Sequence, residues 1–171
     1  MWIPRQLRAV TGEPARASTR EPTEEDGAAE QISSKVKPGK ILVVEDNVDS
    51  RDLLAKLLAM NGYDVLSASD GESGYAAALR NLPDLIITDI NMPRMDGIAL
   101  LKKVRLVNLL NGTAVFVITA LGREAASEAI VAGADAAVAK PFDFDVFIAK
   151  VAELMFARQK VAAKCGRAGK G

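Results

Sequence analysis

Charged or hydroxyl-bearing residues stand at the ends of four separate apolar segments of this chain. They are Glu45, Asp46, Asp89, Thr119 and Lys140. Three carboxylates brought close together repel one another, and a hard divalent cation with oxygen ligands, most commonly Mg²⁺ inside cells, relieves that repulsion. A nearby ammonium group supplies a fixed positive charge for an anion. The set therefore suits transfer of a phosphoryl group onto a carboxylate.

The apolar run that ends at Asp89 is the centre of this hypothesis. Residues 85–88 are apolar and mostly β-branched, which is typical of a strand buried on both faces. Ligands of open parallel α/β sheets bind at the carboxyl ends of the strands, where Asp89 would lie. Taken alone, Asp89 is equally compatible with a loop cap, and Lys140 with an ion-pair partner that holds Asp89 in place. The other residues of the set favour the chemical role.

The elements that must position these residues alternate along the chain. We predict strands over residues 41–44, 63–68, 84–89, 114–119 and 136–139. We predict helices over residues 47–60, 71–82, 97–109, 123–132 and 143–157. This alternation implies right-handed crossovers and a parallel sheet with helices on both faces. Because parallel strands bring their carboxyl ends to one edge of the sheet, the five candidate residues should converge there.

Composition narrows the possible functions. The chain has 171 residues with 22 basic and 22 acidic side chains, so its gross charge predicts neither nucleic-acid nor membrane binding. It contains no histidine, which excludes histidine-based catalysis, metal binding and phosphocarrier roles. A single cysteine, no apolar run of the ~18 residues needed to cross a membrane, and no secretory signal together predict a cytoplasmic protein without membrane insertion.

The two ends of the chain lack a continuous apolar pattern. Prolines and glycines interrupt every candidate helix in residues 1–39, which we interpret as a disordered N-terminal extension. Residues 157–171 are basic and glycine-containing, and we interpret them as a flexible tail. Between them, residues 40–155 carry 11 basic and 16 acidic side chains, a net charge of −5.

Four motifs carry a resemblance to a known family. They are Val44-Glu45-Asp46-Asn47, Thr88 to Gly97 (TDINMPRMDG), Ile118-Thr119-Ala120 and Ala139-Lys140-Pro141-Phe142. The region from residue 40 to 156 resembles the receiver domains of two-component response regulators, the CheY-like proteins. The resemblance implies a flavodoxin-like sheet with strand order 2-1-3-4-5. We also expect a stand-alone receiver, because the segment after Leu154 is too short for an output domain.

The resemblance assigns roles around the phosphoryl group. Asp89 would be the phosphoacceptor, receiving a phosphoryl group from a sensor histidine kinase or a histidine phosphotransfer protein. Lys140 and the hydroxyl of Thr119 would contact phosphoryl oxygens, with the backbone N–H of Ala120 nearby. The receiver would catalyse its own phosphorylation and dephosphorylation without being a turnover enzyme. The peptide bond between Lys140 and Pro141 is usually cis in this family.

The resemblance also implies a Mg²⁺ cofactor. Asp46 would bind the ion directly and Glu45 through water. Asp89 and the main-chain carbonyl of Asn91 would complete the protein's share of the ligands.

The chain departs from the family pattern at one position. Receivers commonly have a tyrosine or phenylalanine three residues before the lysine, and here that residue is Ala137. A switch that pairs a moving threonine with an inward-turning aromatic ring cannot operate without the ring. We therefore expect phosphorylation to be read from backbone shifts near the helix at residues 123–132, or from exposure of other groups.

Three functions remain open at this stage. The first is a receiver whose phosphorylation switches binding to an unidentified downstream protein, with a homodimer as a possible form. The second is a receiver-fold scaffold that binds its partner regardless of phosphorylation. The third and most remote is a phosphatase resembling haloacid dehalogenases. That family needs an aspartate two residues after the nucleophile as general acid, where this chain has Asn91, which cannot deliver a proton.

Overall fold

The computed structural model describes residues 38–167, and the side chains of residues 38–158. The predicted extension over residues 1–39 lies almost entirely outside the described residues and stays a prediction. None of the described helices is long and apolar enough to cross a membrane.

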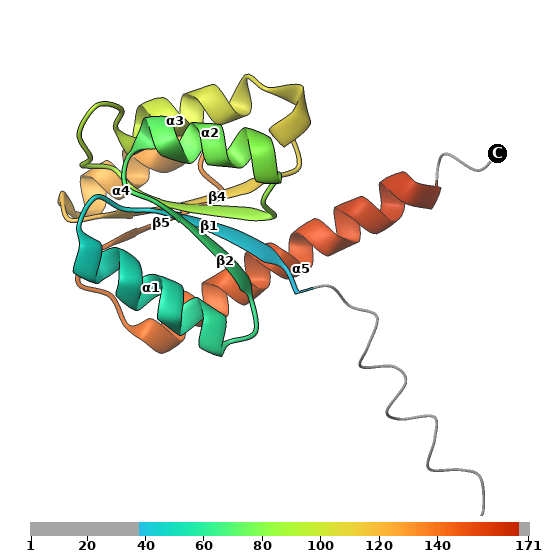
Figure 1. Cartoon of the computed structure of the whole chain (residues 1–171), viewed down its shortest axis with the longest axis horizontal. Helices are drawn as coiled ribbons and strands as arrows, with labels where there is room; N and C mark the ends of the chain where they lie inside the picture. The colour runs from blue at the N-terminus through green and yellow to red at the C-terminus, as the bar shows by residue number, and fades with distance from the viewer. Residues whose placement is uncertain (1–37, 168–171) are drawn as a thin grey trace, which may run out of the picture. The chain divides into compact units, whose positions relative to one another are not determined.

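The described residues form five strands that alternate with five α-helices (Figure 1). The strands are β1 (Lys40–Val44), β2 (Asp64–Ala68), β3 (Leu85–Asp89), β4 (Ala114–Thr119) and β5 (Ala136–Ala139). The helices are α1 (Val48–Met60), α2 (Gly71–Asn81), α3 (Gly97–Arg105), α4 (Gly122–Val131) and α5 (Phe144–Arg167). All neighbouring strands pair in parallel in the order β2-β1-β3-β4-β5, which confirms the predicted fold class.

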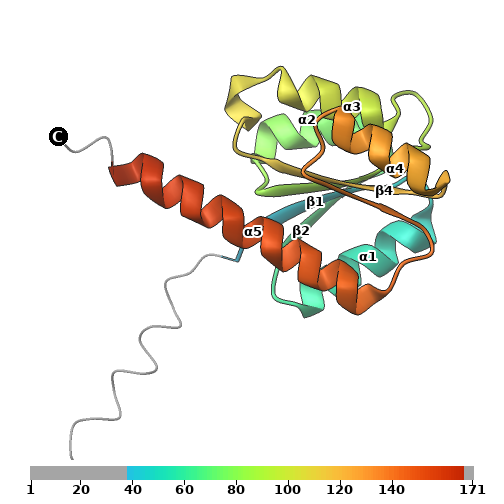
Figure 2. The ribbon, with the colours of Figure 1, turned by 180° about the vertical axis from the view of Figure 1, so that it is seen from behind.

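Two hydrophobic layers cover the sheet. On one face α2, α3 and α4 pack around a cluster that includes Leu42, Ile86 and Val117. On the other face α1 and α5 pack around a cluster that includes Val43, Ile87 and Phe116, as both views show (Figures 1 and 2). Because β3 lies at the centre of this sandwich, all five of its residues are buried. The buried residues of β3 thus fix the position of Asp89 at the carboxyl end of the strand.

The third helix is shorter than predicted. It ends at Arg105, and a 3-10 turn over Asn108–Leu110 replaces the last residues of the predicted helix. Leu106 and Leu109 are exposed, whereas Leu110 is fully buried. The apolar residues after Arg105 predicted that the helix continues. The chain instead leaves the helix axis and turns, and this turn buries Leu110.

The last helix is longer than predicted. It continues to Arg167, whereas the sequence predicted its end near residue 157. The segment from Ala157 to Lys164 consists mainly of alanine, arginine, glutamine and lysine, which favour helices even without an apolar face. Arg158 also ties the helix to the body, because its Nε donates a hydrogen bond of 2.9 Å to Oδ1 of Asp84.

Candidate functional site

Three charged side chains from three strands meet at the carboxyl edge of the sheet. The ammonium of Lys140 donates hydrogen bonds to Asp89 Oδ2 at 2.8 Å and to Glu45 Oε2 at 2.9 Å. Glu45 follows β1, Asp89 ends β3 and Lys140 follows β5. Since β4 separates β3 from β5, the lysine reaches past the end of β4 to the two carboxylates. The sequence prediction that these residues converge is correct for this trio.

Burial and charge act against each other in this trio. Glu45 and Asp89 are 3% and 7% exposed. Burial raises the pKa of Glu45, and the negative charge of Asp89 adds to this, while the Lys140 ammonium partly offsets both. Burial alone would lower the pKa of Lys140, but its hydrogen bonds to Asp89 and Glu45 outweigh that effect and raise it. The lysine is therefore a permanent cation between two buried carboxylates.

The loop after β3 holds the second oxygen of Asp89. The backbone N–H of Asn91 donates to Asp89 Oδ1 at 3.2 Å, and the hydroxyl of Thr88 donates to the Asp89 carbonyl at 2.9 Å. Gly97 returns against the strand end, where its N–H bonds to the carbonyl of Ile90. A Cβ at residue 97 would overlap the Asp89 carbonyl, so only glycine fits there. The carboxylate is thus fixed on both oxygens.

Asp46 does not join this cluster in the structure. Its side chain is exposed, and no three acidic or cysteine side chains of the described residues lie close enough together to hold a metal ion. Glu45 and Asp89 do converge, and both offer carboxylate oxygens, the ligands that hard cations such as Mg²⁺ prefer. The donor chemistry fits magnesium, provided that Asp46 turns toward its neighbours.

Thr119 and Ala120 lie at the same edge without contacting Asp89. Thr119 is fully buried, and its hydroxyl accepts a hydrogen bond of 3.0 Å from the N–H of Leu121. Its carbonyl accepts one of 2.7 Å from the N–H of Lys140, so the ends of β4 and β5 are joined. Among the described residues, no hydrogen bond links Thr119 or Ala120 to Asp89.

Sequence reasoning missed two arginines that support the site. Arg51 of α1 donates from Nη1 to the carbonyl of Glu45 at 2.7 Å, which fixes the backbone after β1. Arg94, in the loop after β3, forms a 2.5 Å ion pair with Asp70. Asp70 is also the N-cap of α2, because its side chain accepts hydrogen bonds from the N–H groups of Glu72 and Ser73. Its ion pair spans 24 residues, so no local sequence pattern indicates it.

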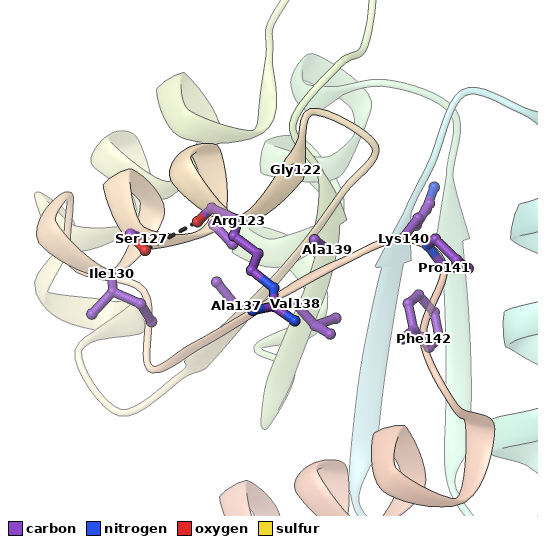
Figure 3. Close-up of a pocket in the computed structure, with 11 residues that line it drawn as sticks. Gly122, Arg123, Ser127, Ile130, Ala137, Val138, Ala139, Lys140, Pro141 and Phe142 are labelled. Carbon is purple, nitrogen blue, oxygen red and sulfur yellow. Dashed lines mark hydrogen bonds between the residues drawn. The ribbon is translucent and has the colours of Figure 1, made fainter.

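A hollow of about 710 Å³ lies between α4, β5 and the loop that precedes α5. Ala137 forms part of its wall, and the side chain of Arg123 extends from α4 toward Val138 (Figure 3). Lys140 and Pro141 also line it, so it adjoins the charged trio. The peptide bond between these two residues is cis, as expected. The small residues of β5 leave open a space that a larger side chain would fill.

A family comparison and two curated relatives place these observations in context. The family model for the response regulator receiver domain matches residues 41–152. A probable chemotaxis protein CheY of Rhizobium etli is 38% identical over 116 residues, covering 67% of this chain and 88% of that protein. The DNA-binding dual master transcriptional regulator RpaA of Synechocystis sp. is 35% identical, covering 68% of this chain and 48% of the relative. The chain spans about half the length of several such regulators it matches.

Solved structures give the same picture of the fold. A putative response regulator from Chloroflexus aurantiacus superimposes with a TM-score of 0.67 at 32% identity, covering 70% of this chain and 98% of the other. Chemotaxis protein CheY4 of Vibrio cholerae superimposes with a TM-score of 0.64 at 29% identity, covering 69% and 99%.

Proposed function

The chain belongs to the response regulator receiver domain family of two-component signalling, and from this premise we propose that Asp89 is its phosphoacceptor. Receivers are signalling modules rather than turnover enzymes. The observation that carries the proposal is the pair of hydrogen bonds by which Lys140 holds Asp89 beside Glu45. The family assignment leaves the phosphatase alternative without support.

The proposed reaction transfers a phosphoryl group from a phosphohistidine of a sensor kinase or phosphotransfer protein. An oxygen of Asp89 attacks the phosphorus atom while the N–P bond breaks, and the released imidazole nitrogen keeps the electron pair and takes up a proton. The second oxygen of Asp89 stays oriented by its neighbours. Lys140 is already 2.8 Å from the attacking carboxylate, so it stabilises charge that develops on the phosphoryl oxygens.

Glu45, Asp46, Asp89 and the carbonyl of Asn91 would hold a magnesium ion beside the acceptor. When bound, Mg²⁺ would neutralise negative charge on the phosphoryl group during its transfer. Glu45 and Asp89 are brought together by the fold, whereas Asp46 is exposed and must turn inward. Arg51 supports both acidic residues of this segment, because its guanidinium also lies 3.4 Å from the carbonyl of Asp46.

The proposed signal passes through Thr119 to the start of α4. The hydroxyl that would bind a phosphoryl oxygen now accepts the N–H of Leu121, the N-cap residue of α4. Movement of Thr119 toward the phosphoryl group would release that N–H and loosen the first turn of α4. This turn borders the hollow at Ala137, so a switch can operate there without an aromatic ring. A downstream protein would read the change on this surface.

The decisive experiment labels the full chain with acetyl phosphate and Mg²⁺ and detects the aspartyl phosphate by mass spectrometry. We expect one phosphoryl group on the wild type and none on Asp89→Asn. Asp96→Asn is the matched control, because Asp96 lies in the same loop and its cap on Ala99 is available to an asparagine. Labelling of Asp89→Asn at the wild-type rate would falsify the assignment.

The scaffold alternative keeps one observation in its favour. The hollow at Ala137 is lined by small side chains of β5, so a partner could enter it whether or not Asp89 is phosphorylated. Binding of partner proteins is therefore compared with and without beryllofluoride, which mimics the phosphoryl group. A switch requires that the affinity change, whereas equal affinities would support the scaffold.

A further inference from the structure

A second pocket, of about 380 Å³, lies at the free edge of the sheet and is not part of the Asp89 site. Its polar lining consists of Arg51, Ser67, Ser69, Ser73 and Arg80. β2 is an edge strand, and α1 and α2 pack on opposite faces of the sheet beside it. Ser73, Ala77 and Arg80 share one face of α2 because their spacing matches the helical repeat. The pocket volume is in the range of small-molecule sites.

The two arginines of this pocket carry uncompensated charge. Neither Arg51 nor Arg80 forms an ion pair with a carboxylate among the described residues. Arg51 is nevertheless held in place, because its Nη1 donates to the Glu45 carbonyl at 2.7 Å. Its other N–H groups remain available to a ligand. A guanidinium that is already oriented loses little conformational entropy when it binds an anion.

One carboxylate also faces the pocket region, and its charge is matched elsewhere. Asp70 accepts hydrogen bonds from the hydroxyls of Ser69 and Ser73 at 3.2 Å and 2.9 Å. Its ion pair with Arg94 offsets its charge, and the same contact holds the pKa of Asp70 well below its usual range. The charged side chains of the pocket lining are therefore the two guanidinium groups.

The edge strand adds neutral donors. The carbonyl of Ala68 faces β1, where it accepts the N–H of Glu45, so the N–H of the preceding residue, Ser67, faces the free edge. The hydroxyl of Ser67 makes no hydrogen bond within the described part of the chain. Ala68 and Ala77 provide apolar wall beside these donors.

We propose that this pocket binds the phosphate group of a small phosphorylated organic molecule. Two guanidinium groups match the charge of a phosphate dianion, and their forked N–H donors suit its oxygens. The Ser67 hydroxyl and N–H supply further donors, and the alanines contact the organic part. The proposal does not depend on phosphorylation of Asp89, so either assignment can fail alone.

The test is an amide NMR titration of the ¹⁵N-labelled full chain with phenyl phosphate in the absence of Mg²⁺. We expect saturable shifts at Ser67, Ser69 and Ser73, and an affinity at least about 10-fold lower in Arg80→Gln. Lys56→Gln is the control, because Lys56 is an exposed cation of α1 outside the pocket. It should leave the affinity unchanged. The amide spectrum of each variant also shows whether its fold is intact.

Competing ligands separate the possible sources of the anion. Phenyl phosphate should bind more tightly than inorganic phosphate if the alanine wall contacts the organic group, and benzoate should bind weakly because it carries a single charge. Equal binding of inorganic phosphate would overturn the small-organic part of the proposal. Shifts confined to Ala120 and Lys140, or an affinity that Arg80→Gln leaves unchanged, would overturn the site.

Discussion

At the scale of single residues, Lys140 determines the charge state of the site. Two buried carboxylates, Glu45 and Asp89, share its ammonium group, which is the cation paired with both of them. Phosphorylation of Asp89 would add negative charge where the lysine already stands. The resting ion pair and the proposed phosphoryl contact therefore use the same group, and its removal should affect stability and chemistry together.

Replacing Lys140 with methionine should lower the free energy of unfolding by about 1–3 kcal/mol at pH 7, because both carboxylates lose their counter-charge. The lysine side chain is 29% exposed, so the cost should be below that of a fully buried pair. Urea denaturation measures it. Lys150→Met, which removes an exposed pair with Glu153, should cost less than about 0.5 kcal/mol. Equal costs for the two variants would contradict the assigned role of Lys140.

Glu45→Gln should make the protein more stable than the wild type at pH 7. The folded state raises the pKa of Glu45 above its usual 4.5, so this residue contributes most stability while protonated. That contribution is complete below pH 4.5 and is lost as the pH rises through the folded pKa. The advantage of Glu45→Gln should therefore shrink as the pH falls toward 4.5. Urea titrations between pH 4 and 8, with Glu153→Gln as control, measure the trend, and a pH-independent difference would argue against it.

At the scale of elements, the loop after β3 is held by a contact from another turn. Asp70 caps α2 and pairs with Arg94, which adopts a backbone φ of 66° in that loop. Few side chains other than glycine and asparagine occupy this region readily, so the ion pair stabilises an otherwise unfavourable turn. The ion pair between Asp70 and Arg94 links the N-terminus of α2 to the loop that carries Asn91.

Substitutions at Asp70 should separate the cap from the ion pair. Asp70→Asn keeps an acceptor for the N–H groups of Glu72 and Ser73 but loses the charge. Asp70→Ala loses both, and should cost about 1 kcal/mol more in unfolding free energy. Since the pair holds the Asp70 pKa low, its contribution is present above the usual value of 3.8 and is lost as the pH falls below it. The difference between wild type and Asp70→Asn should close in acid, and a constant gap would contradict the pair.

Phe147 is the aromatic residue that packs helix α5 against the sheet. Its ring is 2% exposed and stacks on Phe116 and Phe142 at centroid separations of 5.4 Å and 5.2 Å. Phe147→Ala should cost about 3–5 kcal/mol in unfolding free energy. The exposed Phe144 of the same helix provides the control, and Phe144→Ala should cost much less. A similar loss for both would show that packing at Phe147 is not what attaches the helix.

The elements could be predicted to the extent that local patterns determined them. The buried run of β3 and the N-cap at Asp70 are visible in neighbouring residues. The end of α3 could not be predicted, because the burial of Leu110 depends on the rest of the core. The full length of α5 could not be predicted from its apolar face, because that face ends near residue 157. After residue 157 the helix continues on intrinsic helix propensity.

At the scale of the whole molecule, the site is a consequence of strand order. Residues 45, 89 and 140 are far apart in the sequence and meet because β1, β3 and β5 run in parallel to one edge. Alternating strands and helices made that convergence predictable without knowledge of any contact. Side-chain orientation was not predictable: Asp46 is exposed although it adjoins Glu45, and the hydroxyl of Thr119 is bonded to Leu121. Such orientations depend on competing hydrogen bonds that the sequence does not reveal.

Magnesium should raise the stability of the folded chain if Glu45, Asp46 and Asp89 bind it. A ligand that binds only the folded state adds about 2.7 kcal/mol at 100 times its dissociation constant, which raises the thermal midpoint. Residues 40–155 have a net charge of −5, so added cations also act by screening, and NaCl of equal ionic strength is the necessary reference. We expect the midpoint to rise with MgCl₂ beyond this reference.

Asp46→Asn tests whether that rise comes from the proposed ligand set. The Asp46 side chain is exposed and makes no hydrogen bond or ion pair within the described residues, so its substitution should leave the metal-free fold unchanged. If Asp46 turns inward to bind magnesium, the variant should lose most of the midpoint rise while Asp49→Asn, an exposed neighbour in α1, keeps it. An undiminished rise in Asp46→Asn would mean that the ion is held by Glu45 and Asp89 without it. The ion would then have to compete with Lys140 for both carboxylates, and Lys140→Met should tighten its binding.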